Sequence, residues 1–139
     1  MYQVFQVKPV FIYDVEGTYC NNSMWIVPNA SLTLLGILNS KLGWWQISMN
    51  CTEIQNGYQL IFKYLERIRI LGENANVDTW VRQILAQKQS DPAADTTTLE
   101  DKIDLLLYQH YGLSYAEVLL VDEEFELSEK EYATLLSPS

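Results

Sequence analysis

The chain has 139 residues, 48% of them hydrophobic, which is enough for one domain with a sizeable core. The sequence shows no secretory leader pattern, and its apolar runs are broken well short of a membrane span, which argues against exported and membrane proteins. A cytoplasmic protein is therefore expected. Cys20 and Cys51 have neither CxxC spacing nor a histidine nearby, so buried thiols are favoured over a disulfide or a metal site.

The net charge of −9 is unevenly distributed along the chain. Residues 1–70 hold five Lys or Arg and four Asp or Glu, a net charge of +1. Residues 71–139 hold four Lys or Arg and fourteen Asp or Glu, a net charge of −10. The second region should avoid a polyanion, whereas the first could still approach one.

The beginning of the chain predicts short strands. Residues 2–7 alternate aromatic or β-branched side chains with glutamine, which is typical of a half-buried strand. Extended structure is expected to resume at residues 10–13 after Pro9. The apolar run 24–27, which ends at Pro28, predicts a buried strand.

Residues 31–48 predict one long buried helix around which the fold is organised. Its apolar face repeats at helical spacing through Leu34, Leu38, Leu42 and Trp45. A second face carries small residues at positions 36, 40 and 43, where another backbone could approach closely. Residues 50–57 then predict a polar loop, residues 58–62 and 67–71 predict strands, and residues 72–76 predict a turn.

The pattern becomes helical after residue 76. An amphipathic helix is predicted from Val77 to about Gln89, and the Asp91–Pro92 pair ends it. Three capping boxes follow and predict three short helices, and a glycine is expected to close the first of them at Gly112. The boxes pair Thr97 with Glu100, Ser114 with Glu117, and Ser128 with Glu131.

These elements predict an α+β fold: a small mixed sheet packed around a central buried helix, followed by a C-terminal helical tail. Residues 1–72 would form the α/β part and residues 73–139 the helical part packed on it. The sequence offers little catalytic chemistry. His110, the one histidine, lies on an apolar stripe and is interpreted as a core or rim residue. The acids of residues 122–126 lack the spacing of a calcium loop, and no glycine-rich phosphate loop is present.

Polar and aromatic residues in the first half are candidates for DNA contacts. Asparagine can bond adenine edges and serine can bond several bases, while lysine meets phosphates. The alternative is that these are ordinary surface loops; Trp44 and Trp45 are expected in the core. The base-contact candidates are Tyr19, Asn21, Asn22, Ser23, Asn56 and Tyr58, and the phosphate-contact candidates are Lys8, Lys41 and Lys63.

An ordered series of strings resembles the C-terminal part of Type IIG restriction–modification enzymes and Taq-type adenine methyltransferases. The series begins with DVEGTYCNNSMWIVP, LLGILNSKL and KYLERIRI, which look like their target-recognition domain. The string VRQILAQKQSDPAADTTTLEDKIDLLLYQHYGLSYAEVLLVD is similar to their C-terminal tail, and the resemblance covers residues 8–122. It implies recognition of double-stranded DNA, with Leu38, Asn39 and Ser40 as a structural element.

The resemblance also implies what this chain lacks. The family's methyltransferase domain carries an Asn/Asp-Pro-Pro-Tyr/Phe motif, but no two of the four prolines here are adjacent. A non-catalytic chain without its own cofactor is therefore expected, with S-adenosylmethionine bound by an upstream methyltransferase domain or subunit. The alternative is an acidic protein-interaction module, of which a DNA-mimic inhibitor is one form.

Overall fold

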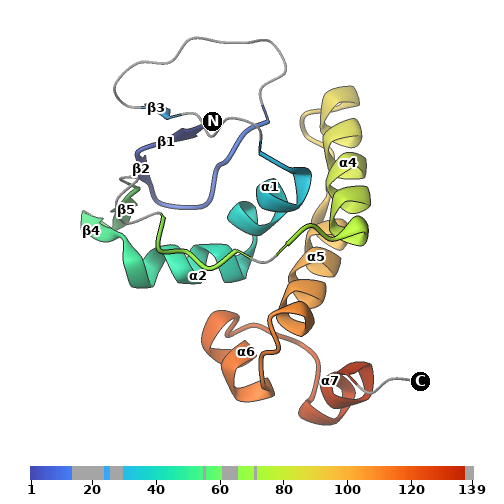
Figure 1. Ribbon diagram of the computed structural model, residues 1–139. Coiled ribbons are helices and arrows are strands. Elements are labelled where there is room, and N and C mark those ends of the chain that lie inside the picture. Colours follow the sequence, from blue (N-terminus) through green and yellow to red (C-terminus); the bar gives the residue numbers. More distant parts are fainter. Residues whose placement is uncertain (14–23, 26–29, 55, 61–65, 71, 137–139) are drawn as a thin grey trace.

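The computed structural model describes residues 1–13, 24–25, 30–54, 56–60, 66–70 and 72–136. Within these ranges the chain is an α+β protein with C-terminal helices, so the predicted fold class is confirmed (Figure 1). The strands are β1 (Tyr2–Gln3), β2 (Phe5–Gln6), β3 (Met24–Trp25), β4 (Thr52–Ile54) and β5 (Gly57–Gln59). The helices are α1 (Leu32–Asn39), α2 (Lys41–Asn50), α4 (Ala75–Ser90), α5 (Thr97–His110), α6 (Tyr115–Val121) and α7 (Glu129–Leu136).

The described strands form two small antiparallel sheets rather than the predicted mixed sheet. β1 pairs with β3, and a second sheet has the order β2-β5-β4. The predicted strand 2–7 is therefore split at Val4, because the chain on either side of this residue pairs with a different partner. At residues 10–13 the described ladder contains only an isolated bridge between Phe11 and Tyr2.

Two further predictions of strand and loop are wrong. The predicted polar loop 50–57 contains the end of α2, all of β4 and the start of β5. Residues 67–70 of the predicted strand 67–71 form turn and irregular structure, and the Gln46 side chain accepts a hydrogen bond from the Arg69 N–H at 2.8 Å. A local alternation of apolar residues does not reveal whether a neighbouring strand is present.

The predicted single helix 31–48 is in fact two helices that meet at Ser40. Ser40 is extended (φ −78°, ψ 164°), and its hydroxyl accepts from the Gly43 N–H at 3.0 Å, which caps α2. The same hydroxyl donates to the Ile37 carbonyl at 2.6 Å and so also closes α1. A side chain at position 43 would overlap the Ile37 carbonyl oxygen, so the corner requires glycine there.

Two hydrophobic cores lie on either side of this helix pair. Ile37 and Leu42 face the core shared with the C-terminal helices, whereas Leu38 and Ile47 face the core shared with the sheets. Because the chain turns at Ser40, the predicted apolar stripe is divided between the two cores. The predicted face of small residues is also divided at Ser40. Gly36 packs closely against side chains of α4 rather than against a backbone, since a methyl group there would lie 2.9 Å from the Val77 side chain.

The C-terminal helices follow the local signals in the sequence. The predicted helix 77–89 is α4, which begins two residues early because the Asn74 side chain accepts from the N–H groups of Asn76 and Val77. At the start of α5 the predicted capping box is wrong, since Thr97 lies inside the helix. The Asp95 carboxylate takes the capping role and accepts from the Thr97 N–H at 3.0 Å and from its hydroxyl at 2.6 Å.

The remaining caps agree with the sequence. Gly112 has a φ of 70°, and the N–H of the next residue, Leu113, reaches back to the Tyr108 carbonyl at 2.9 Å, as in a Schellman motif. Reciprocal capping bonds join Ser114 to Glu117. The same pair of bonds joins Ser128 to Glu131 and confirms the last box.

The helical tail is not a detached appendage. In Figure 1, α1 and α2 lie between the strands and the α4–α5 pair, and α6 and α7 extend from the far end of α5. One core contains Ile37 and Leu42 of the first part together with Val81, Leu107 and Val118 of the second. The two predicted parts therefore share a core across the predicted division at residues 72 and 73.

Candidate functional site

The Leu38–Asn39–Ser40 element builds the corner of the helix pair. Leu38 is buried, and Ser40 caps α2 as described above. The Asn39 side-chain amide makes two hydrogen bonds to the main chain of Phe11. Its oxygen accepts from the Phe11 N–H at 2.8 Å, and its nitrogen donates to the Phe11 carbonyl at 3.0 Å. These bonds add to the antiparallel bridge between Phe11 and Tyr2, so the element joins the N-terminal segment to the corner.

A buried polar cluster links this corner to the C-terminal helices. The Lys41 main-chain N–H donates to Asp104 of α5 at 3.0 Å. The Lys41 ammonium group forms a salt bridge with Asp122 at 3.2 Å, and the Tyr108 hydroxyl lies 3.3 Å from the same carboxylate oxygen. Lys41 is thus tied to the acidic region although its side chain is 48% exposed, and its role as a phosphate contact stays a prediction.

The environment of this cluster shifts the pKa values of its members. Burial raises the pKa of Asp104 to about 6, although the Lys41 N–H and charge oppose the shift. Burial alone would lower the pKa of Lys41, but the hydrogen bond and charge of Asp122 outweigh it and raise this pKa. Burial and the negative charges of Asp104 and Asp122 raise the pKa of Tyr108, which stays protonated.

Lys8 lies at the edge of a groove of about 640 Å³ that we call the corner groove. This groove opens between residues 8–13, the α1–α2 corner, α4 and α5. Much of its wall is apolar, and two acids of α5, Asp101 and Asp104, lie on the same wall as Ile103. Lys8 is exposed, and no salt bridge of Lys8 is seen among the described residues, whereas the exposed Lys41 is paired with Asp122.

Asn56 and Tyr58 lie on the β4–β5 hairpin. Asn56 has a φ of 66°, a left-handed conformation that suits the tight connection between paired residues Ile54 and Gly57. The Tyr58 ring packs edge-on against Trp44 of α2 at 5.3 Å. Tyr58 is therefore partly a packing residue, while Asn56 is exposed at the tip of the hairpin.

Five of the predicted DNA candidates lie outside the described residues. They are Tyr19, Asn21, Asn22, Ser23 and Lys63. Their roles stay predictions, as does the burial of Cys20. The other predicted thiol, Cys51, is buried as expected, and burial raises its pKa.

Three charged residues that were not predicted as site residues are candidates in the structure: Arg67, Arg69 and Asp104. Arg67 and Arg69 are exposed, and the Arg69 main chain is bonded to Gln46 of α2 and to the Tyr111 hydroxyl at the end of α5. Their alternation with isoleucines led to the wrong strand prediction. Asp104 was also missed. Its place between Ile103 and Leu107 on the buried stripe of α5 is a signal that would have found it.

His110, Trp44 and Trp45 were predicted at or near the core, and all three keep exposed surface. His110 is exposed at the end of α5 rather than part of the core, and its ring meets Tyr111 edge-on at 6.5 Å. Trp44 and Trp45 are half-buried instead of fully buried. Across the described residues, no cluster of three or more His, Cys, Asp or Glu is arranged to hold a metal ion.

Comparisons with known proteins add no relative. No protein-family model, curated protein or solved structure matches this chain. None of the helices in the described part of the chain combines the length and the apolar character needed to cross a membrane. The residues themselves and the resemblance of the sequence strings therefore carry the function proposed below.

Proposed function

We propose that this chain recognises double-stranded DNA as the target-recognition part of a Type IIG-like restriction–modification enzyme. The observation that carries the proposal is the ordered series of family-like strings over residues 8–122. Catalysis and S-adenosylmethionine binding belong, in this proposal, to an upstream methyltransferase domain or subunit. The chain itself contributes target recognition and no chemistry.

The corner element supports this assignment. The resemblance implies a structural role for Leu38, Asn39 and Ser40, and each of these residues has such a role in the corner. Asn39 in particular fixes the backbone of residues 10–13, which lead directly into the string DVEGTYCNNSMWIVP. A rigid support at the base of a recognition segment is what accurate positioning on a duplex requires.

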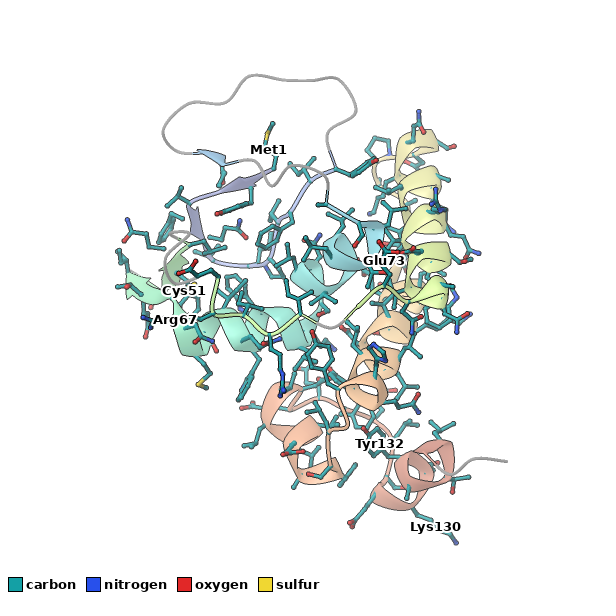
Figure 2. All side chains as sticks on the ribbon, in the orientation of Figure 1. Met1, Cys51, Arg67, Glu73, Lys130 and Tyr132 are labelled. Atoms are coloured by element: carbon teal, nitrogen blue, oxygen red, sulfur yellow. The ribbon has the colours of Figure 1, made fainter. Side chains whose placement is uncertain are left out.

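The distribution of charge also supports the proposal. Figure 2 shows Arg67 near the sheet end of the molecule and Lys130 on α7 at the opposite end. The tail around α6 and α7 carries many exposed acids, including Glu123, Glu124 and Glu129, which would repel phosphates. We therefore propose that the exposed basic side chains of residues 8–13 and 66–70, rather than the acidic α6–α7 region, meet the DNA, and we call these two segments together the proposed DNA face.

Within this face the residues have different proposed roles. Lys8, Arg67 and Arg69 would neutralise phosphates, and Asn56 at the hairpin tip would reach base edges. Lys41 is removed from this set because its ammonium group is paired with Asp122. Three phosphate contacts would give a log–log salt slope of only about −3, so binding by the chain alone should be weak.

The DNA-mimic alternative fits the charge pattern less well. A mimic presents acids along an extended face that imitates the phosphate backbone. Here the acidic residues concentrate in the second half of the chain, after residue 71. One of them, Asp104, is buried beside Lys41 and is not displayed on the surface. The alternative predicts that the chain binds a DNA-binding protein and no duplex.

Fluorescence anisotropy with a labelled duplex at several salt concentrations tests the proposal. The double variant Lys8→Glu/Arg69→Glu should weaken binding and flatten the salt slope by about two units, because two phosphate contacts are lost. The matched control is Lys102→Glu/Lys130→Glu, which makes the same charge change on exposed positions of α5 and α7. This control should bind like the wild-type chain.

Two results would contradict the proposal. If the control variant alone weakened binding, the DNA face would lie on the helical tail. If neither pair changed an otherwise measurable affinity, the phosphates would be met by some other surface, and the proposed face would be wrong.

A further inference from the structure

The corner groove has the size and lining of a small-molecule site. Its volume of about 640 Å³ lies within the range of roughly 300–1,000 Å³ that is typical of ligand pockets. Most of its wall is apolar, with a few polar groups at one side, as in such pockets. The apolar lining includes Phe11, Leu35, Val81, Ile84, Leu85 and Ile103.

An independent observation concerns Asp104, which lines this groove and is only 7% exposed. One carboxylate oxygen accepts from the Lys41 N–H at 3.0 Å. The other carboxylate oxygen of Asp104 accepts no hydrogen bond from the described residues. Among these residues, every fully buried side-chain oxygen or nitrogen atom has a hydrogen-bond partner, so this oxygen is not fully buried. The second oxygen therefore keeps some accessible surface, and the groove is the open space that Asp104 borders.

The Lys41 ammonium group does not hydrogen-bond the Asp104 carboxylate. The Lys41 ammonium group is paired with Asp122 at 3.2 Å, so Asp104 receives only the main-chain N–H of the same residue. Glu100 and Asp101 add negative charge to the same wall of the groove. Its lining also contains two lysines, Lys8 on the N-terminal segment and Lys41, whose ammonium group is paired with Asp122. A buried carboxylate with one hydrogen bond is costly, and a cationic donor in the groove would offset that cost.

We propose that the corner groove binds a small amphipathic cation. Its apolar body would contact the aliphatic side chains of α4 and α5, and its ammonium group would donate to the open oxygen of Asp104. An anion of the same shape is disfavoured by Asp104, Glu100 and Asp101, and a neutral analogue lacks the charge that a buried carboxylate attracts most strongly. This inference does not rest on the proposed DNA recognition, although Lys8 borders the groove as well.

Calorimetry of the full chain with three indole probes tests this site. Tryptamine carries an ammonium group, tryptophol a neutral hydroxyl and indoleacetate a carboxylate on nearly the same body. Tryptamine should bind at least about tenfold more tightly than tryptophol, the usual minimum for a hydrogen bond between charged groups, and indoleacetate should bind most weakly. Equal affinity for the three probes, or no tryptamine binding at about 1 mM, would overturn the proposal, since 1 mM is already the weak end of specific binding.

Variants locate the binding in the groove. Asp104→Asn keeps an acceptor for the Lys41 N–H and should reduce tryptamine affinity to that of tryptophol. Leu85→Trp narrows the groove from α4 while keeping the carboxylate, and it should remove binding of both probes. Glu124→Gln, an exposed charge change outside the groove, is the matched control and should bind like wild type. Tryptamine selectivity that survives in Asp104→Asn would overturn the assignment of Asp104, and circular dichroism establishes that each variant is folded.

Discussion

Replacing Asp104 with asparagine should stabilise the protein at neutral pH, and the gain should depend on pH. Asp104 is 7% exposed and burial raises its pKa to about 6, whereas an unfolded aspartate titrates near 4. At pH values between about 4 and 6, Asp104 is therefore more often protonated in the folded state than in the unfolded state. Raising the pH therefore destabilises the fold, with the stability present below about pH 4 and lost as the pH rises through about 6.

The size of the effect follows from the two pKa values. A difference of about two units corresponds to about 3 kcal/mol at neutral pH, since each unit is worth about 1.4 kcal/mol. Asparagine keeps the hydrogen bond to the Lys41 N–H and removes the charge. The variant should thus match wild type at pH 4 and exceed its free energy of unfolding by up to about 3 kcal/mol at pH 7.

Urea denaturation of wild type and Asp104→Asn at several pH values measures this difference. The comparison cancels the contributions of other carboxylates, such as Glu131, whose pKa is lowered by hydrogen bonds to Ser128. Glu124→Gln, an exposed charge change outside the groove, is the control and should show no such trend. A wild-type protein that is the more stable of the two at pH 7 would refute the reasoning, because Asp104 would then gain more from Lys41 than burial costs it.

Three further substitutions test the packing and the caps. Gly43→Ala should cost about 3 kcal/mol or more because a methyl group there overlaps a carbonyl of α1, whereas Gly72→Ala has open space and should cost little. Leu38→Ala should cost about 2–5 kcal/mol, as large-to-small core changes do; a cost below 1 kcal/mol would place this residue outside the core. Asp95→Ala should lower the melting temperature more than its exposed neighbour Thr98→Ala; equal shifts would show that the Asp95 cap is not formed.

The C-terminal helices were predictable because their signals are local. Reciprocal caps such as Ser114 with Glu117 and a left-handed glycine at position 112 act within a few residues of the chain. The start of α5 shows the limit of this reasoning. Asp95, Thr96 and Thr97 are all residue types that cap helices, and hydrogen-bond geometry selects the first of them.

The corner at Ser40 was not predictable from periodicity alone. The apolar spacing continues unbroken from Leu34 to Trp45, so the sequence reads as one helix. The break becomes clear only when Ser40 caps α2 and Gly43 allows the chain to pass the end of α1. A serine three residues before a glycine inside an apolar stripe is compatible with either outcome.

The polar cluster and the corner groove depend on contacts that are distant in the sequence. Lys41 meets Asp104 and Asp122, which lie 63 and 81 residues further along the chain. Sequence reasoning instead assigned Lys41 to phosphate contacts because it considered charge without a partner. The short strands were predicted only approximately for the same reason, since each depends on which distant segment pairs with it.

Selection from a random pool of duplexes tests the central claim most directly. The full chain is immobilised, the pool is applied at about 50 mM salt, where phosphate contacts are strongest, and the retained duplexes are sequenced after several rounds. Target recognition predicts convergence on one short motif with the wild-type chain, and reduced enrichment of that motif with Lys8→Glu/Arg69→Glu. A retained pool with the same sequence composition as the starting pool would contradict the claim that this chain recognises a DNA target.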